Sequence, residues 1–319
     1  MSANLKQDIA INPESNPSEL TKMTFLTIFS TPKPFTEPHI NIIQRNAIKS
    51  WQQLGQDVEV ILVGEEEGMD QIVKGFGVKH LPNVERNELG TPLVSSIFRL
   101  ARDASTSPFL AYVNADILLF PGFLLVARQV AQQSSHFLIL GQRWDLNVEE
   151  LINFDEDWVA RMRARVNRHG KYHAPSGSDY FIFPRDAFAE IPDFAIGRAG
   201  WDNWMIYHAR QQGWLVIDAT PSLMIVHQNH DYHHLPNGQP HYDLEETKLN
   251  AALGGGMANM YITLDANRVF EDGRIRRPGI SFVRVLRTLE RWIQPRDDIH
   301  QGIRYRVARR LRRLRRKLV

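Results

Sequence analysis

The stretch FLAYVNADILLFPGF, residues 109–123, decides how the rest of the chain is interpreted. Its first five residues are apolar, which is typical of a strand buried in a sheet. Asn114, Ala115 and Asp116 then interrupt the apolar run. Side chains two residues apart at a strand end point the same way, so we expect Asn114 and Asp116 to project together. Two such oxygen-bearing groups can hold Mg²⁺ or Mn²⁺ against a diphosphate, or they can simply cap the following turn.

Apolar strands and amphipathic helices alternate on both sides of this stretch. The alternation predicts an α/β fold with a mostly parallel sheet and helices on both of its faces. Ligands of such sheets bind beyond the carboxyl ends of the strands, where Asn114 and Asp116 are expected. We expect the other strands at 23–31, 58–64, 78–81 and 137–145, one or two strands at 214–228, a strand running into a turn and a helix at 179–191, and helices at 39–55, 69–77, 91–104, 155–170 and 201–213.

Length and composition narrow the class of protein. A chain of 319 residues with 43% hydrophobic and 23% charged residues can bury a full core and has ordinary soluble composition. No apolar run approaches the roughly 20 residues of a membrane span, and the N-terminal sequence lacks the pattern of a signal peptide. The chain has no cysteine, which excludes disulfides, thiolate metal sites and cysteine nucleophiles and fits a reducing cytosol.

The two ends differ in composition from the central part. Residues 1–22 are rich in Asn, Ser, Glu and Pro and are expected to be disordered. Residues 304–319 hold nine Lys or Arg and no acid, so the rest of the chain is mildly acidic and does not favour nucleic acid as a partner. We therefore expect a disordered segment at 1–22, a folded α/β domain at 23–260 and a helical extension with a basic tail at 261–319.

Apolar residues recur at helical spacing within 280–294 and 304–319, among many arginines. This pattern predicts basic amphipathic helices, which suit an anionic membrane surface. A nucleic acid, an acidic partner protein or a helix packed on the domain would give the same pattern.

The order of these elements, together with SGSDYFIFPRDAFAEIPDFAIGRAGWDNWMIYHARQQG (176–213), resembles the GT-A-fold glycosyltransferases, in particular those like family 2. Members of this family carry an Asp-x-Asp motif at the end of a central strand, which binds the metal of a nucleotide-sugar. Here Asn114 replaces the first acid and Asp116 matches the last, which is usually the metal ligand in the family. The resemblance covers about residues 23–230 and implies Mn²⁺ or Mg²⁺ as cofactor.

The resemblance also assigns roles to residues further along the chain. In inverting members an acid at a helix start is the general base that deprotonates the acceptor, and here this position is Asp202. Asp202 can equally be an ordinary helix cap. Trp201 beside it can stack on a sugar ring or pack in the core. A late histidine is the third metal ligand in several such families, and His227 matches it; it can otherwise be a histidine satisfied at a strand end.

Other candidate contacts follow from the same comparison. The remaining histidines between 230 and 241 do not have zinc-site spacing and are expected to belong to a loop that folds over substrate. Asp179 is expected to hydrogen-bond acceptor hydroxyls. Nucleotide contacts are expected from Thr31, Arg45, Arg86 and Arg99, besides Asn114.

The leading hypothesis is therefore a metal-dependent glycosyltransferase that moves a sugar from a nucleotide-diphospho-sugar, most often a UDP-sugar in such families, to a hydroxyl of a glycan or lipid-linked acceptor. Its basic tail would place it on the cytosolic face of a membrane, near envelope-polysaccharide or glycolipid synthesis. A nucleotidyltransferase is the second enzyme hypothesis, although FSTPKPFTEPH (29–39) lacks the glycine-rich loop of that class. The third is a non-catalytic membrane- or nucleic-acid-binding protein on a degenerate scaffold.

Overall fold

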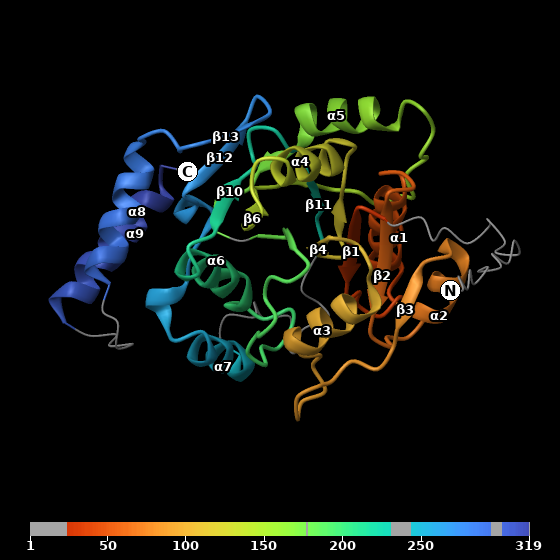
Figure 1. Ribbon diagram of the computed structural model, residues 1–319, viewed down its shortest axis with the longest axis horizontal. Helices are drawn as coiled ribbons and strands as arrows, with labels where there is room; N and C mark the ends of the chain where they lie inside the picture. The colour runs from red at the N-terminus through yellow and green to blue at the C-terminus, as the bar shows by residue number, and fades with distance from the viewer. Residues whose placement is uncertain (1–23, 177, 231–243, 295–301, 319) are drawn as a thin grey trace, which may run out of the picture.

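The computed structural model describes residues 24–176, 178–230, 244–294 and 302–318 (Figure 1). Within them lies one large mixed sheet whose strand order is β13-β12-β10-β6-β9-β4-β1-β2-β3. Strand β9 runs antiparallel to β4 and β6, and β13 runs antiparallel to β12. The strands are β1 (Leu26–Ser30), β2 (Val58–Val63), β3 (Lys79–Leu81), β4 (Phe109–Val113), β6 (Phe137–Leu140), β9 (Tyr180–Pro184), β10 (Leu215–Asp218), β12 (Arg268–Glu271) and β13 (Arg274–Arg276).

Helices cover both faces of this sheet, as the sequence predicts. Helices α1 (Pro38–Gln52), α2 (Met69–Phe76) and α4 (Gly122–Ala131) share one apolar core with the sheet. Helices α3 (Val94–Ala104) and α6 (Trp201–Gln211) share a second core on the opposite face. The predicted α/β class, a mixed Rossmann-like sheet between two helical layers, is confirmed.

A second, smaller sheet has the strand order β5-β11-β7-β8. It consists of β5 (Ile117–Leu118), β11 (Val226–Gln228), β7 (Trp144–Leu146) and β8 (Lys171–Tyr172), and it shares a core with helix α5 (Trp158–His169). The strand predicted at 137–145 is therefore two strands, β6 and β7, in different sheets. The polar pair Gln142 and Arg143 interrupts the run, and the backbone N–H of Gln142 donates to Thr220 Oγ1 at 2.9 Å instead of continuing a strand ladder.

Two further expectations differ from the structure. The helix predicted at the end of 179–191 is a turn, in which Phe188 has a positive φ of 55° that a helix does not accommodate. The large sheet also continues past residue 260, because β12 and β13 belong to it. Residues 1–22 and most of the histidine-rich loop lie outside the described residues.

The last part of the chain is helical, as the sequence predicts. Helix α7 (Glu245–Leu253) and two short 3₁₀ turns (Met257–Asn259 and Thr263–Asp265) lead to β12 and β13. Helices α8 (Phe282–Ile293) and α9 (Ile303–Arg316) then lie together at one end of the molecule, beside β12 and β13 (Figure 1). No helix among the described residues combines the length and apolar composition of a membrane span.

Candidate metal and substrate site

The carboxyl ends of β1 and β4, which run parallel side by side, form the edge of the sheet where the predicted residues lie. Ser30 Oγ and Thr31 Oγ1 at the end of β1, and Asp116 Oδ1 after β4, are buried there and have no hydrogen-bond partner among the described residues. Ser178 Oγ, just before β9, is a fourth such atom. Buried polar atoms in folded proteins nearly always have partners, so this cluster marks the edge as a place for a polar ligand.

Asp116, His227 and His230 form a cluster that could hold a metal ion at this edge. One donor atom from each residue lies within 4.8 Å of the other two. Asp116 Oδ2 is 3.1 Å from His230 Nε2 and 3.6 Å from His227 Nε2. Two ligands at right angles, each about 2.1 Å from an ion, lie about 3 Å apart, so these separations fit one shared ion. The free Oδ1 of Asp116 adds a further possible ligand atom.

The small sheet explains why residues more than a hundred positions apart meet here. His227 is paired with Ile117, the residue after Asp116, across β11 and β5, and with Asp145 across β11 and β7. The backbone N–H of Gln228 and its side-chain Nε2 both donate to the carbonyl of Asp116, at 3.2 and 3.1 Å. This register therefore brings His227 beside Asp116, as the sequence predicted for these two residues.

His230 was not predicted as a ligand. The sequence signal was its spacing of three residues from His227, directly after a strand. Its ring lies 5.5 Å from that of His227, centroid to centroid, and its Nε2 lies 3.5 Å from Lys33 Nζ. A histidine just after a strand can turn toward Asp116 or away from it. The path of the chain after β11 decides which, and the three-residue spacing from His227 does not determine that path.

A second layer of side chains, also missed in the sequence, orients His227. Asp145 Oδ1 is 3.3 Å from His227 Nδ1, and Asp145 Oδ2 is 2.7 Å from His173 Nδ1. Arg143 Nε donates to Asp145 at 2.9 Å. Burial by itself raises the pKa of Asp145, but the hydrogen bond from His173, the adjacent His227 ring and the charge of Arg143 hold it well below its usual value. A carboxylate on the far nitrogen of a histidine is the usual way to orient a metal-binding imidazole.

Asp116 remains ionised although its side chain is only 17% exposed. Burial opposes ionisation, but His227, the hydrogen bond from His230 and the nearby Lys33 ammonium together hold the pKa of Asp116 well below its usual range. Asp116 is therefore held as a carboxylate, the form that can bind a cation. Lys33, which follows β1 in FSTPKPF, was not predicted as a site residue.

Asn114 and Asp179 face each other beside this cluster. Asn114 Nδ2 donates to Asp179 Oδ1 at 3.0 Å, and Arg143 Nη1 donates to the same oxygen at 2.5 Å. Asp179 is 6% exposed, so the predicted contact with an acceptor hydroxyl would have to use its other oxygen. The geometry gives a reason for asparagine in place of the family's first acid: an acid at 114 would face the Asp179 carboxylate.

Replacing Asn114 with aspartate is therefore expected to destabilise the fold and to leave Mn²⁺ affinity no tighter. The change removes a hydrogen bond donor and sets two carboxylates against each other, at a cost of about 1–3 kcal/mol. Chemical denaturation measures the free energy of unfolding, and calorimetry measures Mn²⁺ binding. The exposed Asn83 provides the matched control, Asn83→Asp. A variant at 114 with wild-type stability and tighter Mn²⁺ binding would contradict this explanation.

Asp202 lies in the first turn of α6, where a carboxylate ordinarily has a low pKa. Burial instead raises the pKa of Asp202 to about 6, against the lowering effect of backbone N–H groups that include those of Asn203 and Gly200, and the Asp179 charge raises it further. Its hydrogen bond from the N–H of Gly200 is long, 3.4 Å. Asp202 is thus poorly described as a simple cap and has the elevated pKa that suits a general base.

Asp202 and Asp116 both lie near enough to Tyr112, which is buried at the end of β4, for their charges to act on it. The charges of Asp116, Asp179 and Asp202 all raise the pKa of Tyr112, after the larger effect of burial. The ring of Trp201, next to Asp202, packs against Tyr112 with 4.9 Å between centroids. The predicted base and the predicted metal ligand therefore flank the same part of the sheet edge.

Trp201 itself does not present a face to a sugar. It is 5% exposed, and its ring also contacts Phe98 and Phe181 edge-on. The prediction of a sugar-stacking role is not supported by this placement, because an aromatic cluster from α3, β4 and β9 surrounds the ring. Its position at the start of α6 instead holds Asp202 in place.

The predicted nucleotide-binding arginines have other partners. Arg86 Nη2 pairs with Glu66 at 3.0 Å, and Arg99 Nη2 pairs with Glu85 at 2.6 Å. The Arg45 guanidinium lies over the Phe76 ring, 5.6 Å from its centroid. None of these contacts places an arginine at the Asp116 cluster, so their roles at a nucleotide stay predictions. Thr31, with its unpartnered hydroxyl at the end of β1, is the nucleotide candidate that the structure locates at the edge.

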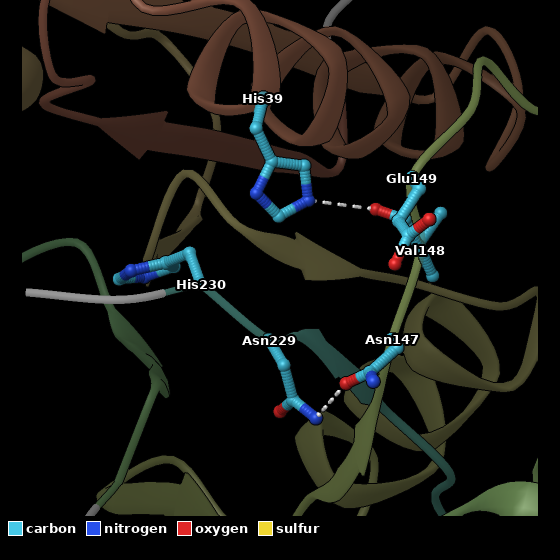
Figure 2. Close-up of a pocket in the computed structure, with 6 residues that line it drawn as sticks. All are labelled: His39, Asn147, Val148, Glu149, Asn229 and His230. Carbon is cyan, nitrogen blue, oxygen red and sulfur yellow. Dashed lines mark hydrogen bonds between the residues drawn. The ribbon is translucent and has the colours of Figure 1, made fainter.

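An open pocket of about 330 Å³ adjoins the cluster. Figure 2 shows His39, from the start of α1, with its Nε2 donating to the Val148 carbonyl at 2.9 Å, and Asn229 donating to Asn147 at 2.7 Å. His230 belongs both to this pocket and to the cluster, so a ligand in the pocket would reach the metal-binding residues. The lining residues are His39, Asn147, Val148, Glu149, Asn229 and His230.

No family model and no curated protein matches this sequence. Among solved structures, the chain is similar to a mannosyltransferase from Pyrobaculum calidifontis in complex with GDP-Man and Mn²⁺, with 14% identity, a TM-score of 0.42 and coverage of 65% of this chain and 57% of that one. It is also similar to glucosyl-3-phosphoglycerate synthase from Mycobacterium tuberculosis in complex with Mn²⁺, UDP and glucosyl-3-phosphoglycerate, with 12% identity, a TM-score of 0.45 and coverage of 81% and 88%.

Proposed function

We propose that the protein is a metal-dependent glycosyltransferase, which transfers a sugar from a nucleotide-diphospho-sugar to a hydroxyl acceptor. The observation that carries this proposal is the cluster of Asp116, His227 and His230 at the carboxyl edge of a mixed α/β sheet. A half-buried carboxylate with an elevated pKa, Asp202, flanks the same edge. One group to bind a donor's metal and another to accept a proton are the two parts that the reaction requires.

The donor set favours Mn²⁺ over Mg²⁺. Asp116 would supply oxygen, and His227 and His230 would supply imidazole nitrogens, which Mg²⁺ accepts less readily than Mn²⁺ does. The bound ion would neutralise the charge that develops on the leaving nucleoside diphosphate. Lys33, beside Asp116, would add a further positive charge toward the phosphates, and the Thr31 hydroxyl would donate to them.

Asp202 would act on the acceptor. Its carboxylate would take the proton of the acceptor hydroxyl as the oxygen forms its bond to the anomeric carbon, while the bond from that carbon to the diphosphate breaks. A base with a pKa near 6 is ionised at neutral pH and is more basic than an ordinary aspartate. In a retaining reaction Asp202 would instead orient the substrate.

The finer assignments follow the resemblance. We propose a UDP-sugar as donor and a glycan or lipid-linked hydroxyl as acceptor, as in envelope-polysaccharide or glycolipid synthesis. The basic C-terminal helices would keep the enzyme peripheral on the cytosolic face of a membrane.

The test is thermal unfolding of the whole chain with UDP or GDP, in Mn²⁺, in Mg²⁺ and in EDTA. A nucleotide present at about 100 times its dissociation constant stabilises the folded state by about 2.7 kcal/mol, which raises the midpoint by several degrees. We expect this rise with Mn²⁺, a smaller rise with Mg²⁺ and none in EDTA.

The same measurement, repeated with UTP and GTP, separates the alternatives. A non-catalytic scaffold, which the replacement of the first acid by Asn114 favours, predicts no stabilisation by any nucleotide with any metal. A nucleotidyltransferase predicts stabilisation by a nucleoside triphosphate in preference to the diphosphate. Either result would overturn the proposed function.

A further inference from the structure

Helices α8 and α9 each leave a stripe of large apolar side chains exposed. On α8 the stripe consists of Phe282, Val285, Leu289 and Trp292, at spacings of three and four residues that place them on one helical face. Phe282 is 64% and Trp292 is 79% exposed, and Ile280 just before the helix is 96% exposed. The matching stripe on α9 is made of Ile303, Val307, Leu314 and Leu318. Exposed apolar surface of this extent normally marks an interaction site.

The polar residues of α8 point the other way, into a buried ionic network. Glu290 is 1% exposed and accepts hydrogen bonds from Arg287 at 3.0 Å, Arg312 at 2.7 Å and Arg315 at 3.0 Å. Asp265 receives a second set of bonds from Arg287, the shortest at 2.7 Å. These pairs join α8 to α9 and join both to the domain, so the apolar stripes belong to a fixed two-helix surface.

Among the described residues of 277–318, the exposed charges are all positive. None of the exposed basic residues of α9 forms an ion pair with another residue that the structure describes. No exposed acid occurs in the described parts of 277–318, because Glu290 is buried. The exposed basic residues are Arg304, Arg306, Arg309, Arg310, Arg313, Arg316 and Lys317.

We infer that α8 and α9 together form a docking surface for an anionic lipid bilayer, with α8 as its apolar anchor. Large apolar side chains enter the boundary between headgroups and acyl chains, and arginines pair with lipid phosphates. The sequence predicted basic amphipathic helices at 280–294 and 304–319, but it did not show that Arg312 and Arg315 point inward to Glu290. A nucleic acid would use the arginines but gains little from nine exposed apolar side chains, and a second copy of this surface would set its arginines against like charges.

Helix α8 also contacts the edge that carries the candidate site. Arg284, in the first turn of α8, places its Nη2 3.4 Å from Asp218 Oδ2, and Asp218 is the last residue of β10. Strand β10 runs parallel to β6, which runs in the same direction as β4, so Asp218 and Asp116 lie along the same edge. The inference deepens the proposed function, because it names the bilayer surface on which the enzyme would meet a lipid-linked acceptor. Bilayer docking itself does not depend on sugar transfer.

The test is sedimentation of the full chain with vesicles of phosphatidylcholine containing 30% phosphatidylglycerol, compared with pure phosphatidylcholine. We expect binding to the anionic vesicles and little to the neutral ones. Arg309→Gln with Arg313→Gln should weaken binding on the order of 10- to 30-fold, since each basic residue near a charged bilayer contributes measurably. Phe282→Ser with Trp292→Ser should weaken it at least as much, which a purely electrostatic attraction would not predict.

Matched variants elsewhere on the surface serve as controls. Arg163→Gln with Arg168→Gln removes the same charge from exposed positions of α5, and Leu89→Ser removes an exposed apolar side chain from a loop. Both should bind vesicles like the wild type. All variants should keep the Mn²⁺-dependent stabilisation by nucleotide. If the proposed function is wrong, all of them should lack it, whatever the result with vesicles. Failure of the proposed function and failure of the docking proposal can therefore be told apart.

Three outcomes would overturn the inference. The first is equal or absent binding to both kinds of vesicle. The second is that the Arg163→Gln and Arg168→Gln control loses as much binding as the α9 variant, which indicates net charge alone. The third is a dimer in light scattering that Phe282→Ser with Trp292→Ser converts to a monomer, with no vesicle binding by either form, which would assign the surface to a second copy of the chain.

Discussion

Asp116→Asn is expected to weaken Mn²⁺ binding by two orders of magnitude or more and to reduce sugar transfer on the order of a thousandfold. Asparagine keeps the shape of the side chain and removes its charge. In the folded protein it would leave His227 and His230 without the carboxylate that both contact, at 3.6 and 3.1 Å. Isothermal calorimetry with Mn²⁺ measures the binding, and release of nucleoside diphosphate from a donor sugar measures the transfer.

The same substitution should lower stability at neutral pH. The pKa of Asp116 is depressed in the folded state, so its ionised form stabilises the fold above its unfolded pKa, and this contribution is lost as pH falls through the folded pKa. Asp116→Asn removes the contribution at every pH, and the difference in unfolding free energy from wild type should shrink under strongly acidic conditions.

A graded series identifies the metal site. Asp145→Asn, which changes only the residue that orients His227, should weaken Mn²⁺ binding about 10- to 100-fold. The exposed Asp157→Asn should leave it unchanged. Wild-type Mn²⁺ affinity in the Asp116 variant would show that the cluster is not the metal site, and the proposed function would lose its main support.

Asp202→Asn should abolish most sugar transfer while Mn²⁺ and nucleotide binding persist. The same substitution should make the folded protein more stable. Loss of a general base typically reduces the rate about 10²- to 10⁴-fold. Because burial raises the pKa of Asp202 to about 6, ionising it in the folded state costs free energy that the unfolded chain does not pay. Asparagine avoids this cost, and the gain should be about 3 kcal/mol above pH 7.

The sign of the pH dependence follows from the same pKa. A carboxyl group with a raised folded pKa is more protonated in the folded than in the unfolded state between about pH 4 and 6. Wild-type stability should therefore decline across this interval as pH rises, and the stabilisation by Asp202→Asn should be absent near pH 3.5 and complete above pH 7. Thermal unfolding at a series of pH values measures both.

Activity should show the complementary profile. The wild-type rate should fall as pH drops below about 6, because the protonated acid cannot accept the acceptor's proton. If Asp202→Asn transferred sugar at the wild-type rate, or if it lost nucleotide binding together with activity, Asp202 would not be the base, and a role in packing α6 would explain the loss instead.

Much of the fold follows from local patterns. The apolar runs that became β1, β2 and β4 and the amphipathic pattern that became α1 are each decided by neighbouring residues, and the structure reproduces them closely. The segment 137–145 was misjudged because its apolar start and its aromatic end join different sheets. A pattern within one segment does not show which neighbour each half will pair with.

The sequence by itself determined that this chain forms an α/β sheet between helices, and that Asp116 follows a buried strand where such sheets bind ligands. Only the tertiary structure decided that His230 completes the cluster with His227, that Trp201 is buried among Phe98, Tyr112 and Phe181, and that α8 exposes its apolar face. The physical reason is the distance along the chain between the residues that interact. Strand formation depends on residues a few positions apart, whereas ligand geometry, burial and pKa depend on strand register and packing between residues more than a hundred positions apart.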